Sequence, residues 1–214
     1  IQIFVLAVAL LVGIGSASVI SRMMGSGNED RAARAVGNAL VMIFLLASVL
    51  TVLGLAFLEP LLHLLGSTDE LRGYAREYLT VILPGAPFLA TAIAANHIVR
   101  SEGRARVAMV IMLIGAGLNI VLDPIFIFVL GLGVRGAALA TITAQFTSFL
   151  FALGFYLTGR SSLNVRLRHI RLHRDIVPEV AAVGLATFIR QFGQSFFIII
   201  VNNVLRSFGD ELAI

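Results

Sequence analysis

Six long apolar stretches divide this chain, and they limit its fold more than any other feature. They comprise residues 1–20, 37–58, 79–98, 107–130, 136–158 and 180–205. Each has about 20 residues or more, which is enough to cross a hydrocarbon core of roughly 30 Å as an α-helix. A helix satisfies its own backbone hydrogen bonds in lipid, whereas β-barrel strands are half as long and alternate with polar residues. The chain is therefore expected to be an all-α polytopic membrane protein.

Composition agrees with this fold class and removes several others. Of the 214 residues, 58% are hydrophobic and only 13% are charged, whereas a soluble domain of this size needs far more polar surface. The absence of cysteine excludes disulfides and thiolate metal sites. His169 and His173 are four residues apart but have no acidic or cysteine partner in sequence, so they do not predict a metal site. No organic cofactor is expected.

Arginine placement predicts how the helices are oriented, because cytoplasmic loops of membrane proteins carry an excess of basic residues. All 16 basic residues are arginines. Eleven of them lie in three alternate connections, residues 21–36, 99–106 and 159–179. The connections between these, residues 59–78, 131–135 and 206–214, hold four, and Arg190 lies within an apolar segment. The first set is expected to face the cytoplasm, in a multi-pass protein of the cytoplasmic (inner) membrane.

Residues 159–179 form the longest and most basic connection. We interpret it as a boundary between two helical bundles. Its basic character is explained most simply by an ordinary cytoplasmic loop. A more specific interpretation is a surface that binds anionic lipid. Nucleic-acid binding is disfavoured because the stretch has no interleaved aromatic residues.

The chain begins at Ile1 and ends at Ile214, each close to an apolar run. We therefore expect it to be a piece of a longer protein whose first helix precedes Ile1.

Prolines predict irregular helices at two places. Pro84 and Pro87 flank Gly85 within residues 79–98, and each proline removes a helical hydrogen bond and can bend the helix. Such bends either line a transporter cavity with freed carbonyl groups or are passive, and the sequence leaves both readings open. Asn96, at the cytoplasmic end of the same segment, is expected to serve as an interfacial cap rather than as part of a buried site.

The polar residues of the fourth segment form the strongest candidate site. Asp123 is an acid within an apolar span, and such a costly group marks a functional site by default. Asn119 lies four residues earlier and therefore on the same helix face. Pro124 follows Asp123 directly and is expected to bend the helix and free the carbonyl group of Ile120.

The next segment brings further polar groups to this depth. With the turn centred at Gly133, Asp123 lies roughly 15 Å back along one helix and Thr141 roughly 12 Å along the next, at about 1.5 Å per residue. Gln145 shares a face with Thr141. A carboxylate, an amide and a hydroxyl that converge in this way can hold a proton, or coordinate Na⁺ through oxygen ligands. The alternative is that Asp123 only bonds Asn119 or the backbone and fixes the hairpin.

These residues also carry a family resemblance. The run NIVLDPIFIFVLGLGVRGAALAT, residues 119–141, resembles the multidrug and toxic compound extrusion (MATE) family of efflux transporters, in its prokaryotic branch. Residues 21–40, 98–106 and 183–205 match the family as well, and so does the pair Glu77–Tyr78. One departure is that the family's usual Gly-Leu-Pro reads Gly184-Leu185-Ala186 here, so the proline that would bend the helix at this point is absent.

The resemblance implies a fold of twelve transmembrane helices in two six-helix lobes, of which this chain would cover the second to the seventh. Residues 1–158 would then form an N-lobe that lacks its first helix, residues 159–179 the cytoplasmic inter-lobe loop, and residues 180–214 the start of the C-lobe. Asn119, Asp123 and Thr141 match the family's cation site, which an acid of the absent first helix completes.

The function implied is secondary active efflux of cationic or amphipathic small molecules by alternating access. Inward flow of H⁺ or Na⁺ would drive it, and the protein would act as a monomer embedded in the lipid bilayer. Gln145 and Arg190 are candidates for lining the cavity, and Na⁺ at Asp123 is the only metal for which a site is expected. Three alternatives stay open: a flippase of lipid-linked oligosaccharide, a non-transporting membrane scaffold and a membrane-embedded enzyme. The enzyme is the least favoured, because the apolar spans contain no second acid and no cluster of metal ligands.

Overall fold

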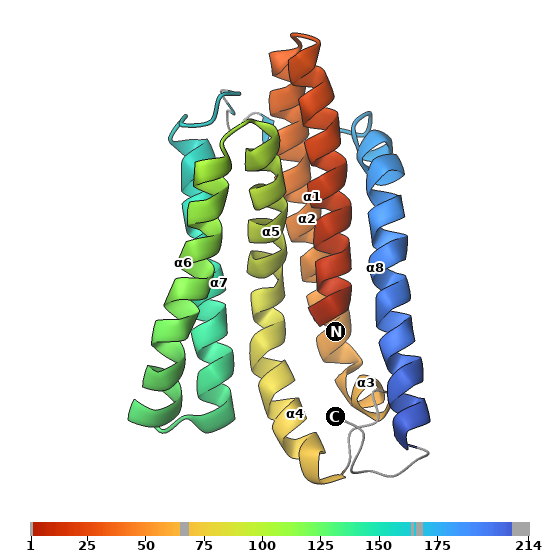
Figure 1. The fold of residues 1–214 in the computed structure, drawn as a ribbon, viewed down its shortest axis with the longest axis vertical. Helices are drawn as coiled ribbons and strands as arrows, with labels where there is room; N and C mark the ends of the chain where they lie inside the picture. The colour runs from red at the N-terminus through yellow and green to blue at the C-terminus, as the bar shows by residue number, and fades with distance from the viewer. Residues whose placement is uncertain (1, 65–68, 164, 166–168, 207–214) are drawn as a thin grey trace.

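The computed structural model describes residues 2–64, 69–163, 165 and 169–206, and every regular element among them is helical (Figure 1). The α-helices are α1 (Gln2–Gly25), α2 (Glu29–Ala56), α3 (Leu58–Leu64), α4 (Asp69–Ile82), α5 (Ala86–Ser101), α6 (Ala105–Pro124), α7 (Gly133–Leu157) and α8 (Val177–Arg206). A short 3-10 turn (Leu83–Gly85) joins α4 to α5, and a π-helix (Ile125–Val129) extends α6. The expectation of an all-α fold is confirmed for this part of the chain.

The helices run roughly antiparallel, so their connections gather at two ends. The α1–α2, α5–α6 and α7–α8 connections lie together at the upper end in Figure 1, and α3 with the α6–α7 turn lies at the lower end. The sequence predicts the same alternation, with the arginine-rich connections on one side. Asn28 caps α2 at the upper end by accepting a hydrogen bond from the backbone N–H of Arg31 at 3.2 Å.

Five helical spans of the described residues are long and apolar enough to cross a membrane. They are Ile3–Gly25, Glu29–Ala56, Gly73–Ser101, Ala105–Val129 and Gly133–Leu157. Residues 59–78 were expected to be a connection without a long helix, and this expectation is wrong. They contain nearly all of α3 and most of α4, and the third span already begins at Gly73. The sequence did not predict α4 because this helix is amphipathic. The polar residues on one of its faces lower the average hydrophobicity of the segment, although its other face is apolar.

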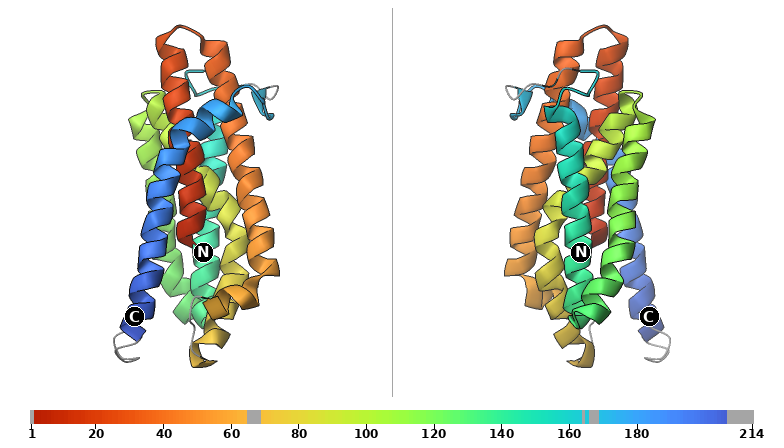
Figure 2. Two further views of the ribbon diagram at one scale, coloured as in Figure 1. Left: turned by 90° about the vertical axis from the view of Figure 1, so that its right-hand side faces the viewer. Right: turned by 90° about the vertical axis from the view of Figure 1, so that its left-hand side faces the viewer.

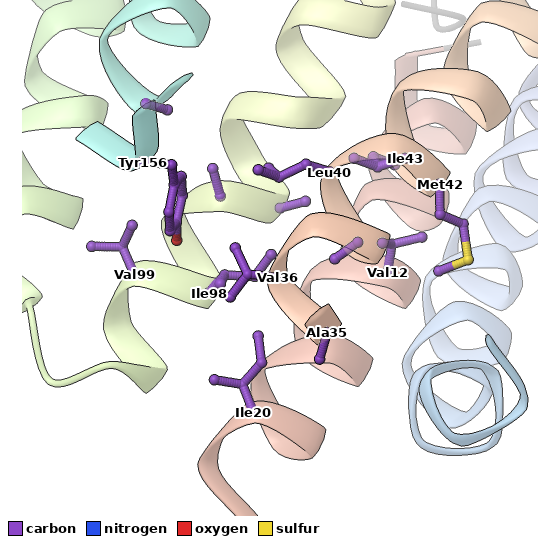
Figure 3. Close-up of a cluster of buried hydrophobic side chains, with 14 of the residues drawn as sticks. Val12, Ile20, Ala35, Val36, Leu40, Met42, Ile43, Ile98, Val99 and Tyr156 are labelled. Carbon is purple, nitrogen blue, oxygen red and sulfur yellow. The ribbon is translucent and has the colours of Figure 1, made fainter. Parts of the chain in front are cut away.

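Small and β-branched side chains fill the core between α1, α2 and α5 (Figure 3). Val12, Val36 and Ile98 are buried there, with Val36 close to Ile98, and Tyr156 lies on the α7 side. Many of the other buried positions are alanines. Lipid tails are as apolar as the core, so helices in a membrane associate through close packing, which small residues permit.

Two glycine contacts bring α8 against α1. A Cβ on Gly184 would lie 2.1 Å from the carbonyl oxygen of Leu11, and one on Gly15 would lie 2.3 Å from that of Val180. The rings of Phe4 and Phe188 extend the contact, with centroids 6.0 Å apart. Figure 2 shows α8 beside α1, on the opposite side of the bundle from α6 and α7.

The connection between α7 and α8 lies against the end of the bundle. Asn38 donates its Nδ2–H to the carbonyl oxygen of His173 at 2.7 Å, and a Cβ on Gly37 would lie 2.0 Å from the carbonyl oxygen of His169. Buried Glu102 accepts a hydrogen bond from Ser161 Oγ at 2.7 Å. The described residues of this connection are therefore packed onto α2 and the end of α5. Arg166 and Arg168, two of its predicted cytoplasmic cations, lie outside the described residues.

Candidate functional site

The α6–α7 hairpin positions the polar residues of the candidate site. Gly131 and Gly133 have φ values of 65° and 54°, a conformation that favours glycine, and they make the turn. Beyond the turn, a Cβ on Gly136 would lie 2.5 Å from the carbonyl oxygen of Phe126. Only glycine allows the two backbones to approach this closely. The π-helix follows Pro124 directly, and π-helical turns are common beside functional sites.

Asn119, Asp123 and Thr141 form one hydrogen-bonded group. The Nδ2 of Asn119 donates to Asp123 Oδ1 at 3.0 Å and to Thr141 Oγ1 at 3.3 Å. The Thr141 hydroxyl donates to the carbonyl oxygen of Ala137 at 2.9 Å, which leaves its lone pairs directed away from its own helix. All three side chains are half-buried. The structure thus brings together the three residues whose spacing predicts convergence.

A cavity of about 420 Å³ lies beside this group, between α5, α6 and α7. Asn119 and Thr141 line it, and Asp123 is linked to it through Asn119. Its lining comprises Leu89, Ala92, Ile93, Asn96, His97, Ile111, Met112, Gly115, Ala116, Asn119, Thr141, Ala144, Gln145 and Ser148. An apolar cavity with a few convergent polar groups is the usual form of a small-molecule site.

Three polar residues of this cavity were not predicted from sequence. Asn96 donates its Nδ2–H to the carbonyl oxygen of Ala108 at 2.6 Å, so its expected role as an interfacial cap is wrong. Buried Ser148 donates to the carbonyl oxygen of Ile111 at 3.0 Å. His97 lines the cavity beside Asn96. The signal was present, since all three are polar residues within apolar segments, but only the three-helix arrangement shows that they face one cavity.

The remaining predicted residues lie in different places. Gln145 lines the cavity, whereas Arg190 is exposed on α8 and is not among the residues that line it. Pro84 lies in the 3-10 turn and Pro87 in the first turn of α5, so together they separate α4 from α5. Pro124 is the last residue of α6.

The donor set decides which ions this group could hold. Among the described residues, no three His, Cys, Asp or Glu side chains gather as metal ligands. Asp123 supplies one carboxylate, Asn119 one amide oxygen and Thr141 one hydroxyl. Oxygen ligands with one negative charge suit a proton or a hard monovalent cation, and the group contains no imidazole or thiolate of the kind that Zn²⁺ and Cu²⁺ prefer.

The comparisons with known proteins agree with this architecture. The family model MatE matches residues 1–125. The multidrug export protein MepA of Staphylococcus aureus is 26% identical over 200 residues, which are 94% of this chain and 44% of that protein. The FAD transporter of Shewanella oneidensis is 34% identical over 146 residues, which are 66% of this chain and 32% of that protein.

A solved structure extends the likeness to the whole fold. It is the inward-facing conformation of a multidrug resistance MATE family transporter of the MOP superfamily, and it superposes with a TM-score of 0.90 at 32% sequence identity. The match covers 99% of this chain and 48% of that one, so the chain spans about half the length of its relatives. These relatives are transporters rather than enzymes. The family match over more than half of its residues, with the same helical fold, shows that this chain belongs to the MATE family.

Proposed function

We propose that the full-length protein is a secondary active efflux transporter and that Asp123 carries its coupling cation. The observation that carries this proposal is the bonded group of Asn119, Asp123 and Thr141 beside a cavity of about 420 Å³. An acid within a membrane span needs partners, and here its partner also lines the cavity. A change in the charge of Asp123 therefore has a direct route to a bound substrate.

The coupling follows from what Asn119 does in each state of Asp123. With the carboxylate ionised, Asn119 donates to Asp123 and to Thr141. Protonation removes the negative charge that attracts this donor, and Na⁺ would instead draw the oxygens of all three residues toward itself. Either event changes the contact between α6 and α7 at the cavity wall. Cation binding and substrate binding would then favour different conformations, which is the requirement for exchange.

The substrates proposed are cationic or amphipathic small molecules. Support comes from the mainly apolar lining of the cavity with a few polar groups and from the multidrug export protein among the relatives. An apolar wall accepts many aromatic and aliphatic shapes, and the nearby carboxylate favours a positive charge. No organic cofactor is required, because the ion gradient supplies the energy.

A second candidate substrate is an anionic flavin nucleotide. The relative named FAD transporter is 34% identical to this chain over 146 residues. Arg190, exposed on α8, would suit such a substrate better than it would suit a cation. Transport assays with FAD and with a cationic dye, run on the same vesicles, distinguish the two candidates.

The division of the chain is part of the proposal. Residues 1–158 would belong to the N-lobe, residues 159–179 would join the lobes on the cytoplasmic side, and residues 180–214 would open the C-lobe. The protein would act as a monomer in the cytoplasmic membrane, with the two lobes enclosing the substrate path.

The proposal is tested with Asp123→Asn in the full-length protein. The amide keeps the size of the side chain but cannot release a proton or pair with Na⁺ by charge, so ion-driven dye efflux from vesicles is expected to fall at least about tenfold, the change that corresponds to roughly 1.4 kcal/mol. Asp175→Asn, at an exposed acid of the α7–α8 connection, is the matched control and should transport normally. Full efflux by Asp123→Asn at normal expression would refute the role and favour a structural one.

A further inference from the structure

A second, separate groove of about 260 Å³ lies between α2 and α7, over α5. It is lined by Leu40, Val41, Phe44, Leu45, Thr91, Ala95, Phe149, Ala152, Leu153 and Ile170. None of these residues lines the cavity beside Asp123. Leu45 is 53% exposed, so the groove opens on the outer surface of the bundle. That surface lies away from α8, which packs on α1 (Figure 2).

The groove offers hydrocarbon and almost nothing else. Its one hydroxyl, that of Thr91, already donates to the carbonyl oxygen of Pro87 at 2.7 Å. Aromatic rings bound its end in mid-span: Phe149 lies 6.1 Å from Phe44 and 5.3 Å from Phe88 between ring centroids. A polar or charged ligand would lose its water here without gaining a partner. A flexible alkyl chain has no hydrogen bonds to water that it would give up.

The opposite end of the groove meets the α7–α8 connection. Ile170 lines the groove there, and the packing of Gly37 against the backbone of His169 and Ile170 holds it in place. Arg171 follows directly, exposed, and no carboxylate pairs with it in the described part of the chain. Arg174, three residues later, is exposed as well. The apolar groove thus ends at the arginine-rich end of the bundle, at Ile170, and two exposed arginines follow it in the same connection.

We propose that this groove binds an anionic phospholipid of the cytoplasmic leaflet. One acyl chain lies between α2 and α7 and reaches toward the rings of Phe44 and Phe149, and the phosphate group lies beside Arg171. The charge complementarity selects the occupant: a neutral lipid fills the groove equally well but gains nothing from the guanidinium group. The proposal is independent of what the protein transports and needs only that the arginine-rich end faces the cytoplasm.

The experiment uses the full-length protein in nanodiscs. Each sample contains either phosphatidylglycerol or phosphatidylcholine that carries the same photoreactive group on one acyl chain, and the labelled peptides are mapped by mass spectrometry. Label is expected on residues 40–45 and 149–153, with phosphatidylglycerol preferred roughly fivefold, the effect of about one arginine near a membrane surface. Arg171→Gln should reduce this preference to near unity. Leu45→Trp, which fills the groove from an exposed position, should remove the label from both lipids.

Arg104→Gln is the matched control, because Arg104 is an exposed arginine in the α5–α6 turn, at the same end of the bundle. It should keep the full preference. Label spread evenly over all the helices would overturn the proposal. So would a preference that survives Arg171→Gln, or one that Arg104→Gln removes to the same extent, because the lipid would then respond only to the overall positive charge. Both arginine substitutions are at the surface, so the comparison does not depend on a variant that fails to fold.

Discussion

At the scale of single residues, Asn119 is the centre of the candidate site. Its amide bonds both Asp123 on its own helix and Thr141 on the next. Spacing alone predicted this meeting, because residues four apart share a helix face and a tight turn matches the depths of two antiparallel helices. Asn96 and His97 could not be predicted in the same way. They lie on a third helix, and no spacing in the sequence relates its rotation to that of α6.

Glu102 is a buried acid whose surroundings change its pKa. It follows α5, outside the span, and is 7% exposed. Burial raises the pKa of its carboxyl group, although hydrogen bonds from Ser161 and Ser162 oppose the shift. The folded protein therefore holds a proton more tightly than the unfolded chain does. Stability from this group is greatest at low pH and is lost as the pH rises from the ordinary value of 4.5 through the raised one.

Glu102→Gln should remove this pH dependence. The glutamine side chain still accepts a hydrogen bond from Ser161 but has no proton to lose. We expect the unfolding temperature of wild type, relative to that of the variant, to fall as the pH rises through this window. Thermal unfolding in detergent at several pH values measures the difference, with exposed Glu29→Gln as the reference for loss of a negative charge. Parallel pH profiles for wild type and Glu102→Gln would contradict the assignment.

At the scale of helices, glycines set how closely α8 approaches α1. The length of the apolar stretches predicts the two helices but not their contact, because nearly every face of a membrane helix is apolar and the composition does not mark which face packs. α4 shows the opposite failure. Its polar residues concealed a helix at the end of the bundle, because there the composition no longer separates helix from loop.

Gly184→Ala and Gly193→Ala form a matched pair on α8. The new Cβ at Gly184 would meet the carbonyl oxygen of Leu11, whereas at Gly193 nothing lies within 4 Å. Gly184→Ala should destabilise the protein by about 1–3 kcal/mol through overpacking. Gly193→Ala should be neutral or stabilising by up to about 1 kcal/mol, because alanine favours the helix. Unfolding temperatures in detergent provide the comparison, and equal changes for the two variants would show that the contact is not tight.

At the scale of the whole molecule, the arginine distribution and the fold agree on which connections share an end. The connections after α1, α5 and α7 lie together, and these are the arginine-rich ones. The positive-inside rule assigns this end to the cytoplasm. The assignment decides the direction of transport and the leaflet from which the groove would take its lipid.

Ser162→Cys tests the orientation. The chain has no cysteine, and Ser162 is exposed in the α7–α8 connection. A membrane-impermeant maleimide should label this variant only after the cells are opened. Leu132→Cys, in the α6–α7 turn at the other end, should react in intact cells. The reverse pattern would invert the proposed topology.

The central claim, that Asp123 carries the coupling cation, is tested most directly by ion movement in liposomes containing the purified full-length protein. An imposed outward gradient of substrate should drive opposite movement of H⁺, followed with a pH-sensitive dye, or of Na⁺, followed with a radioactive tracer. In wild type one of the two ions is expected to move in step with the substrate, and with Asp123→Asn neither should move above the level of empty liposomes. Substrate-driven ion movement of wild-type size in Asp123→Asn would contradict the claim.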